Sequence, residues 1–111
     1  MAANETEQTT GTQPKEIVHV DESFEPLIPK FMTNRKKEVA TMTEALAAQD
    51  FETVRKVSHG MKGAGGSYGF DLISEIAAVI EQAAKTSDAS IIQEKLPFLA
   101  AYLERIEVVY D

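Results

Sequence analysis

Residues 55–70, RKVSHGMKGAGGSYGF, combine a helical pattern with five of the six glycines in the chain. At about 100° per residue, Val57, Met61 and Ala64 lie on one face of a helix. His59 lies on the opposite face. The segment therefore predicts an amphipathic helix that packs through its apolar stripe and holds a histidine on its solvent side.

The neighbours of His59 on this helix are unusual for a purely structural element. Arg55, Lys62 and Gly63 lie one turn away from it. Gly60 and Gly63 each cost roughly 1 kcal/mol in a helix interior relative to alanine. A helix whose backbone must be approached by another surface has a reason to carry glycine there. We therefore expect His59 to stand on a cationic and sterically open face.

Helical spacing of apolar residues also precedes this segment. It begins near residue 21, with Asp21 as a predicted N-cap, and extends to about residue 48. Pro26 and Pro29 suit the first turns of a helix and would break its interior. The regular helix is therefore expected to begin near one of these prolines, after a short separate turn.

Three further helices are predicted from the spacing and from N-cap residues. Asp50 is the expected N-cap of the helix that contains residues 55–70, and this helix is expected to end at about Gly65 or Gly66. The third helix is predicted over about residues 70–85. The fourth is predicted over about residues 89–109, after an N-cap at Asp88.

These elements predict an all-α fold. No segment shows sustained alternation of apolar and polar residues, so no strand is expected. Four helices joined by short connections have antiparallel neighbours, which predicts an up-down four-helix bundle over residues 21–111. Residues 1–20 are rich in Thr, Gln, Asn and Glu and are expected to form a flexible N-terminal extension. A monomer is expected because each apolar stripe can be buried within one bundle.

The composition excludes several classes of function. The chain has 111 residues, 43% of them hydrophobic, which is the size of one domain. It has no cysteine, so a disulfide, a thiolate zinc site and a cysteine nucleophile are excluded. The formal net charge of −7 repels phosphate backbones, so nucleic acid is not an expected partner.

The sequence also bears on location. No apolar run approaches the roughly 18 residues of a membrane span, so no membrane association is expected. The N-terminal residues lack the basic start and the apolar stretch of a secretory signal. A cytoplasmic protein is therefore expected.

The surroundings of His59 suit the acceptance of a phosphoryl group. An unperturbed imidazole has a pKa of about 6.5. At pH 7 it is therefore mostly neutral and carries a lone pair that can act as a nucleophile. The cations Arg55 and Lys62 favour an incoming dianionic phosphoryl group. The sequence indicates no second catalytic group for general-base catalysis on a small substrate.

Residues 59–63, HGMKG, place Lys-Gly three and four positions after a histidine, and residues 65–70, GGSYGF, supply small residues and an aromatic-glycine step. This pattern resembles the signature of histidine-containing phosphotransfer (Hpt) domains. The resemblance covers about residues 22–109. It also includes Phe31, the pair Ala45-Leu46, Asp50 and the pair Ile80-Glu81.

The resemblance implies a four-helix bundle whose second long helix presents a phosphorylatable histidine. Carried over by position, His59 accepts the phosphoryl group on Nε2, Lys62 stabilises its charge, and Gly63 lets the partner approach. Glu81 or Gln82 falls where a polar side chain of the following helix orients the other imidazole nitrogen. The residues expected to border the docked partner are Arg55, Lys56, Gly60 and Gly66.

Two residues depart from the family pattern. Gly60 stands where a larger residue is commoner, which is expected to loosen the helix. Pro97 lies inside the last predicted helix and is expected to kink it, because it removes one backbone hydrogen bond.

The resemblance also implies a partner, namely the receiver domain of a response regulator or of a hybrid histidine kinase. That receiver supplies the aspartate and the Mg²⁺ ion, so the chain itself needs no cofactor. Phosphoryl transfer requires mainly alignment and charge stabilisation, so the chain can act as a phosphocarrier rather than an enzyme. No ATP site is apparent, and no kinase activity of its own is expected.

Other interpretations of the same residues are weaker. A lone surface histidine usually has no role, but Lys62 and Gly63 beside His59 favour phosphotransfer. The glycines do not match a phosphate-binding loop, because no Gly-Lys-Ser/Thr follows them and a helix precedes them. With two histidines, one of them in the predicted N-terminal extension, and no Glu-x-x-His pair within the predicted helices, a metal site is not expected. The remaining alternative is a helical adaptor that binds a receiver or kinase domain without phosphotransfer.

Overall fold

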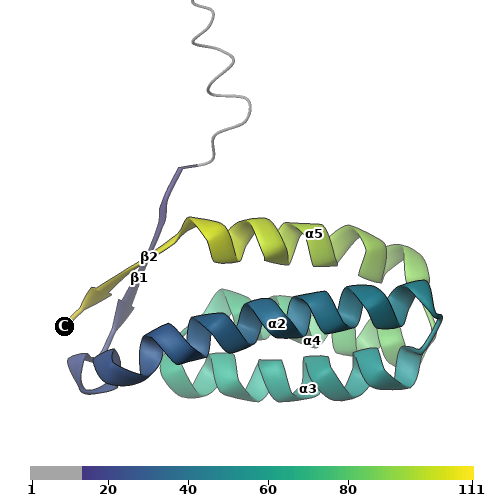
Figure 1. Ribbon diagram of the computed structural model, residues 1–111, viewed down its shortest axis with the longest axis horizontal. Helices are drawn as coiled ribbons and strands as arrows, with labels where there is room; N and C mark the ends of the chain where they lie inside the picture. Colours follow the sequence, from purple (N-terminus) through teal and green to yellow (C-terminus); the bar gives the residue numbers. More distant parts are fainter. Residues whose placement is uncertain (1–13) are drawn as a thin grey trace, which may run out of the picture.

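The computed structural model describes residues 14–111, and its path is drawn in Figure 1. The elements are, in chain order, β1 (Glu16–Val20), the 3₁₀ helix η1 (Glu22–Leu27), α2 (Ile28–Ala47), α3 (Phe51–Tyr68), α4 (Asp71–Lys85), α5 (Ala89–Arg105) and β2 (Ile106–Tyr110).

The four α-helices form a bundle. Figure 1 shows each helix returning alongside the one before it, from α2 through α5. The most extensive packing is between α3 and α4, while α2 packs against α3 and α5, and α4 packs against α5. The prediction of a mostly helical protein with four helices is confirmed. Among residues 14–111, no helix combines the length and the apolarity that crossing a membrane requires.

Local sequence signals explain where the helices begin. The Asp50 carboxylate accepts a hydrogen bond from the backbone N–H of Thr53 at 3.1 Å, and that of Asp88 accepts one from Ile91 at 3.3 Å. Each bond satisfies an N–H that has no partner within its own helix. Asp21 caps η1 in the same way, so all three predicted N-caps are confirmed. The expected short turn before the first regular helix is also confirmed, as η1.

The end of α3 differs from the prediction. The glycines at positions 65 and 66 were expected to end this helix, but it continues to Tyr68 and ends at Gly69, whose φ of 87° is left-handed. Gly65 lies inside the helix and is buried against the start of α4. A Cβ at this position would lie 3.0 Å from the Ser74 backbone nitrogen and 3.1 Å from the Phe70 carbonyl oxygen. Gly65 is therefore a close-packing glycine rather than a helix stop.

The expectation that the chain contains no strand is wrong. β1 and β2 form a two-stranded parallel sheet, in register from Glu16 opposite Ile106 to Val20 opposite Tyr110. The last helix therefore ends at Arg105 and not near residue 109. In β2, exposed residues alternate with half-buried ones, and the half-buried residues pack against the core, as a strand requires.

The same sheet changes the assignment of the N-terminal extension. Residues 16–20 belong to the fold, and Val20 is buried in the core. Residues 1–13, for which a flexible tail is predicted, lie outside the described residues. Pro97 lies in the middle of α5, and the helix continues on both sides of it. The kink expected at this proline stays a prediction.

We predict that Gly65→Ala destabilises the fold by about 1–3 kcal/mol, because the added methyl group meets backbone atoms that cannot move independently. The matched control is Gly66→Ala. A Cβ there lies 3.8 Å from Ser74 Oγ, an ordinary contact, so helix propensity should raise stability by up to about 1 kcal/mol. Urea unfolding of both variants measures this difference. Equal effects would contradict the close-packing role of Gly65.

Candidate functional site

His59 projects from the solvent side of α3. The buried residues of this helix lie on its other side and anchor it to the core; they are Val54, Ser58, Met61 and Gly65. The side chain of His59 is 66% exposed. The amphipathic pattern of the sequence therefore places the imidazole where another molecule can reach it.

One nitrogen of the imidazole is held by a carboxylate. His59 Nδ1 lies 2.9 Å from Oε2 of Glu81, which comes from α4 and has a side chain only 7% exposed. An ionised carboxylate can only accept a hydrogen bond, so this contact assigns the hydrogen to Nδ1. The lone pair of the neutral ring then lies on Nε2, the nitrogen farther from Glu81.

Two lysines also approach the Glu81 carboxylate. Lys62 Nζ lies 2.7 Å from Oε1, and Lys85 Nζ lies 3.9 Å from Oε2. The hydrogen bond from Lys62 holds the pKa of the Glu81 carboxyl below its usual range; burial opposes this shift, and the hydrogen bond from His59 adds to it. Glu81 is therefore charged at neutral pH and links α4 to two side chains of α3.

The sequence model of the Hpt domain matches residues 27–108, which is more than half of the chain. The chain belongs to the Hpt domain family. Hpt domains carry phosphoryl groups on histidine in phosphorelays and are phosphocarriers rather than enzymes in the usual sense. No curated protein and no solved structure matches the chain. Strand β1 lies outside the matched range, so the two-stranded sheet is only partly covered by the Hpt match.

The residues predicted to border a partner of this Hpt domain fall into two groups. Arg55 Nε donates to Glu52 Oε1 at 3.1 Å, and Lys56 Nζ lies 4.0 Å from Glu52 Oε2. These two cations therefore pair with a carboxylate on their own helix. Gly60 and Gly63 are exposed, and a Cβ on either would meet nothing within 4 Å. Their lack of a side chain is not explained by packing within the described residues.

Gly66, the last of the predicted docking residues, is exposed but faces the α4 side, where a Cβ would meet Ser74 Oγ. Of the two candidates for orienting the imidazole, the structure brings Glu81 to His59 and leaves Gln82 exposed on the next position of α4. The sequence could not choose between them, because the choice depends on how α4 is rotated against α3.

The sequence interpretation overlooked two residues near the site. Lys85 follows Glu81 by four residues, the spacing at which a glutamate and a lysine on one helix interact. This spacing in the sequence could have indicated the contact. Ser74 Oγ donates to the Lys62 carbonyl oxygen at 2.9 Å and ties α4 to the backbone beside the site. No local pattern indicates this contact. Within residues 14–111, no cluster of His, Asp and Glu side chains is suited to hold a metal ion.

The lowered pKa of Glu81 predicts a pH-dependent stability. We expect Glu81→Gln to destabilise the protein by about 1 kcal/mol at pH 7, because Lys62 and His59 lose a charged acceptor and remain partly solvated. A carboxyl whose pKa is lowered by folding stabilises the fold above its ordinary pKa of about 4.3 and loses this contribution as the pH falls through the lowered value. The difference between wild type and variant should therefore shrink below about pH 4.

Urea unfolding between pH 3 and pH 7 measures this difference. The matched control is Glu75→Gln, the same change at an exposed position of α4, which should alter stability by less than about 0.5 kcal/mol. A wild-type advantage over Glu81→Gln that stays constant down to pH 3 would show that the charge of Glu81 does not stabilise the fold.

Proposed function

We propose that His59 is the phosphoacceptor of this Hpt domain and exchanges phosphoryl groups with the aspartate of a receiver domain. The observation that carries the proposal is the contact between His59 and Glu81. An exposed imidazole with Nδ1 hydrogen-bonded to a buried carboxylate offers Nε2 as a nucleophile in a defined orientation. The other histidine of the chain, His19, contacts only an exposed carboxylate, that of Asp111, which is not held in place by burial.

In the proposed reaction the Nε2 lone pair attacks the phosphorus of the partner's aspartyl phosphate. A P–N bond forms, the P–O bond to the aspartate breaks, and the aspartate leaves with the electron pair. The hydrogen remains on Nδ1, so the ring gains positive charge as the new bond forms. The Glu81 carboxylate, 2.9 Å from Nδ1, stabilises that charge, and the reverse transfer follows the same path.

Lys62 is proposed to stabilise the phosphoryl group on His59. Its ammonium group is bound to Glu81 at 2.7 Å, and its side chain is partly exposed. A flexible lysine stem allows the ammonium group to turn toward a dianionic phosphoryl group one helical turn away. Glu81 would thus hold both the imidazole and the cation that serve the same transfer.

The partner is proposed to be a receiver domain of a response regulator or of a hybrid histidine kinase. We propose that the receiver supplies the aspartate and the Mg²⁺ ion, and that the transfer is catalysed there rather than on this chain. The open surface at Gly60 and Gly63 supports a catalytic role for the partner, because it lets a second protein reach the α3 backbone beside His59. The monomeric state and the cytoplasmic location expected from the sequence stay predictions.

We expect wild-type protein incubated with radiolabelled, phosphorylated receiver domains to acquire a label that is acid-labile and alkali-stable. His59→Gln should acquire none, and should keep its helical circular dichroism spectrum because the side chain is exposed. His19→Gln is the matched control. His19 is the other histidine of the chain, is also exposed, and contacts Asp111 rather than Glu81, so this variant should label like wild type.

Label on His59→Gln would refute the assignment of the phosphoacceptor. A wild-type protein that binds receivers but takes no label from any of them would instead support the adaptor function.

Gly63→Glu tests the approach of the partner. A side chain at position 63 points into open space, so the variant should fold, and its helix propensity is higher than that of glycine. The rate of phosphotransfer should fall at least about tenfold, because the new carboxylate lies one turn from His59 and repels both the partner surface and the phosphoryl group. Gly63→Ala, the smaller change at the same position, should reduce the rate less. Unchanged transfer by Gly63→Glu would argue against close approach at this position.

A further inference from the structure

A hollow of about 350 Å³ lies between α2 and the last turns of α3. Its volume is near the lower end for ligand pockets, so it has room for one large side chain rather than for a peptide. Its lining includes Leu27, Lys30, Phe31, Arg35 and Ser67.

The hollow has an apolar wall and a cationic rim. Leu27, which is 48% exposed, and the buried Phe31 ring form part of the wall. The Arg35 guanidinium lies 4.7 Å from the centre of that ring, and its charge is matched by Glu38 at 2.8 Å. The exposed Lys30 therefore supplies the net positive charge of the rim.

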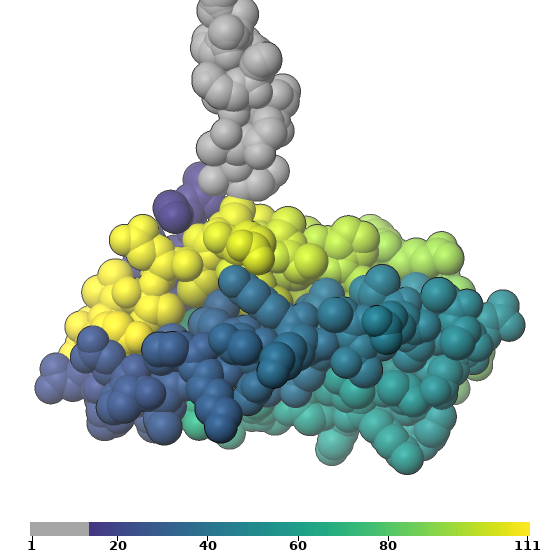
Figure 2. Space-filling view, in the orientation of Figure 1, coloured from purple at the N-terminus to yellow at the C-terminus, as the bar shows by residue number. Residues whose placement is uncertain are grey.

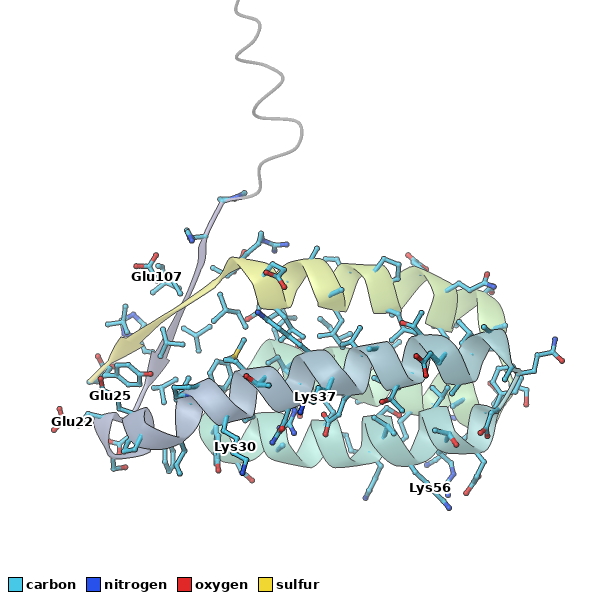
Figure 3. All side chains as sticks on the ribbon, viewed as in Figure 1. Glu22, Glu25, Lys30, Lys37, Lys56 and Glu107 are labelled. Carbon is cyan, nitrogen blue, oxygen red and sulfur yellow. The ribbon has the colours of Figure 1, made fainter. Side chains whose placement is uncertain are left out.

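The helices on either side of the hollow are basic, although the chain is acidic. α2 and α3 contain seven basic and three acidic residues, and the rest of the chain contains four basic and fifteen acidic residues. Figure 3 shows Lys30, Lys37 and Lys56 along these two helices, with Glu22, Glu25 and Glu107 at the end formed by η1 and β2. In Figure 2, α2 and α3 occupy much of one face of the molecule. Lys30 and Lys37 are exposed and form no ion pair with another residue in the range 14–111, so they supply the uncompensated positive charge of this face.

The hollow lies about two helical turns from His59 along α3. His59, Gly63 and Ser67 follow one another at intervals of four residues along α3, and Ser67 lines the hollow. A rise of 1.5 Å per residue separates His59 from Ser67 by about 12 Å. A protein interface of ordinary size covers about 800 Å² on each partner, so a protein seated over His59 is wide enough to reach the hollow.

We propose that this hollow is a specificity pocket for the receiver domain, which inserts an apolar side chain beside Leu27 and Phe31 and places a carboxylate against Lys30. The proposal rests on the proposed phosphotransfer function and adds the chemistry that selects the partner. Charge complementarity on the rim favours receivers with an acidic docking surface, while the apolar part of the wall favours a side chain that fits the hollow.

Lys30→Glu and Ser67→Trp test the two parts of the proposal, with a receiver domain that labels the wild type as the probe. Lys30→Glu reverses the rim charge, and Ser67→Trp fills the hollow. Each should raise the KM for the phosphorylated receiver about tenfold and change kcat less than about twofold, because neither residue touches His59. At 0.5 M salt the effect of Lys30→Glu should largely disappear, whereas that of Ser67→Trp should remain.

The matched control is Lys95→Glu on α5, the same charge change on a helix that does not line the hollow. It should leave KM within about twofold of wild type. An equal increase of KM in Lys30→Glu and Lys95→Glu, or an unchanged KM in both Lys30→Glu and Ser67→Trp, would overturn the pocket while leaving phosphotransfer through His59 intact. Failure of every receiver to label the wild type would overturn phosphotransfer, and the pocket with it.

Discussion

The Glu81 carboxylate is the interaction on which the site depends. It is nearly buried at the seam between α3 and α4, where a charged group without partners would strongly destabilise the fold. His59 and Lys62 supply those partners, so the group that orients the imidazole is itself kept charged by the site. The same contacts that join the two helices therefore fix the orientation of the imidazole. One carboxylate thus serves both the packing of the two helices and the proposed phosphotransfer.

The close packing of α3 on α4 makes this arrangement possible. Gly65 lets the backbone of α3 pass within contact distance of the first turn of α4, and Ser74 adds a hydrogen bond to the α3 backbone near Lys62. A helix pair separated by a larger side chain at position 65 would move Glu81 away from α3. The glycines of this segment thus have two distinct uses: one permits helix packing inside the protein, and two leave the outer surface open.

Much of the fold and the exposed position of His59 could be predicted from local patterns. The amphipathic stripe of residues 55–70 predicts that His59 is exposed, and three aspartates mark the N-termini of helical segments. The end of α3 could not be predicted in this way, because the role of Gly65 depends on a neighbouring helix. Glu81 could be separated from Gln82 only once the rotation of α4 was known. The strands were overlooked because each spans five residues and their pairing joins positions about 90 residues apart.

The parallel pairing of β1 with β2 has a consequence for how the protein is made. Residue 16 is synthesised ninety residues before its partner at position 106. Until then the apolar side of β1, including Val20, has no strand beside it, so this sheet can close only after all four helices have emerged from the ribosome. Ordering of the first described residues is thus a late event in biosynthesis, and the helices must assemble without it.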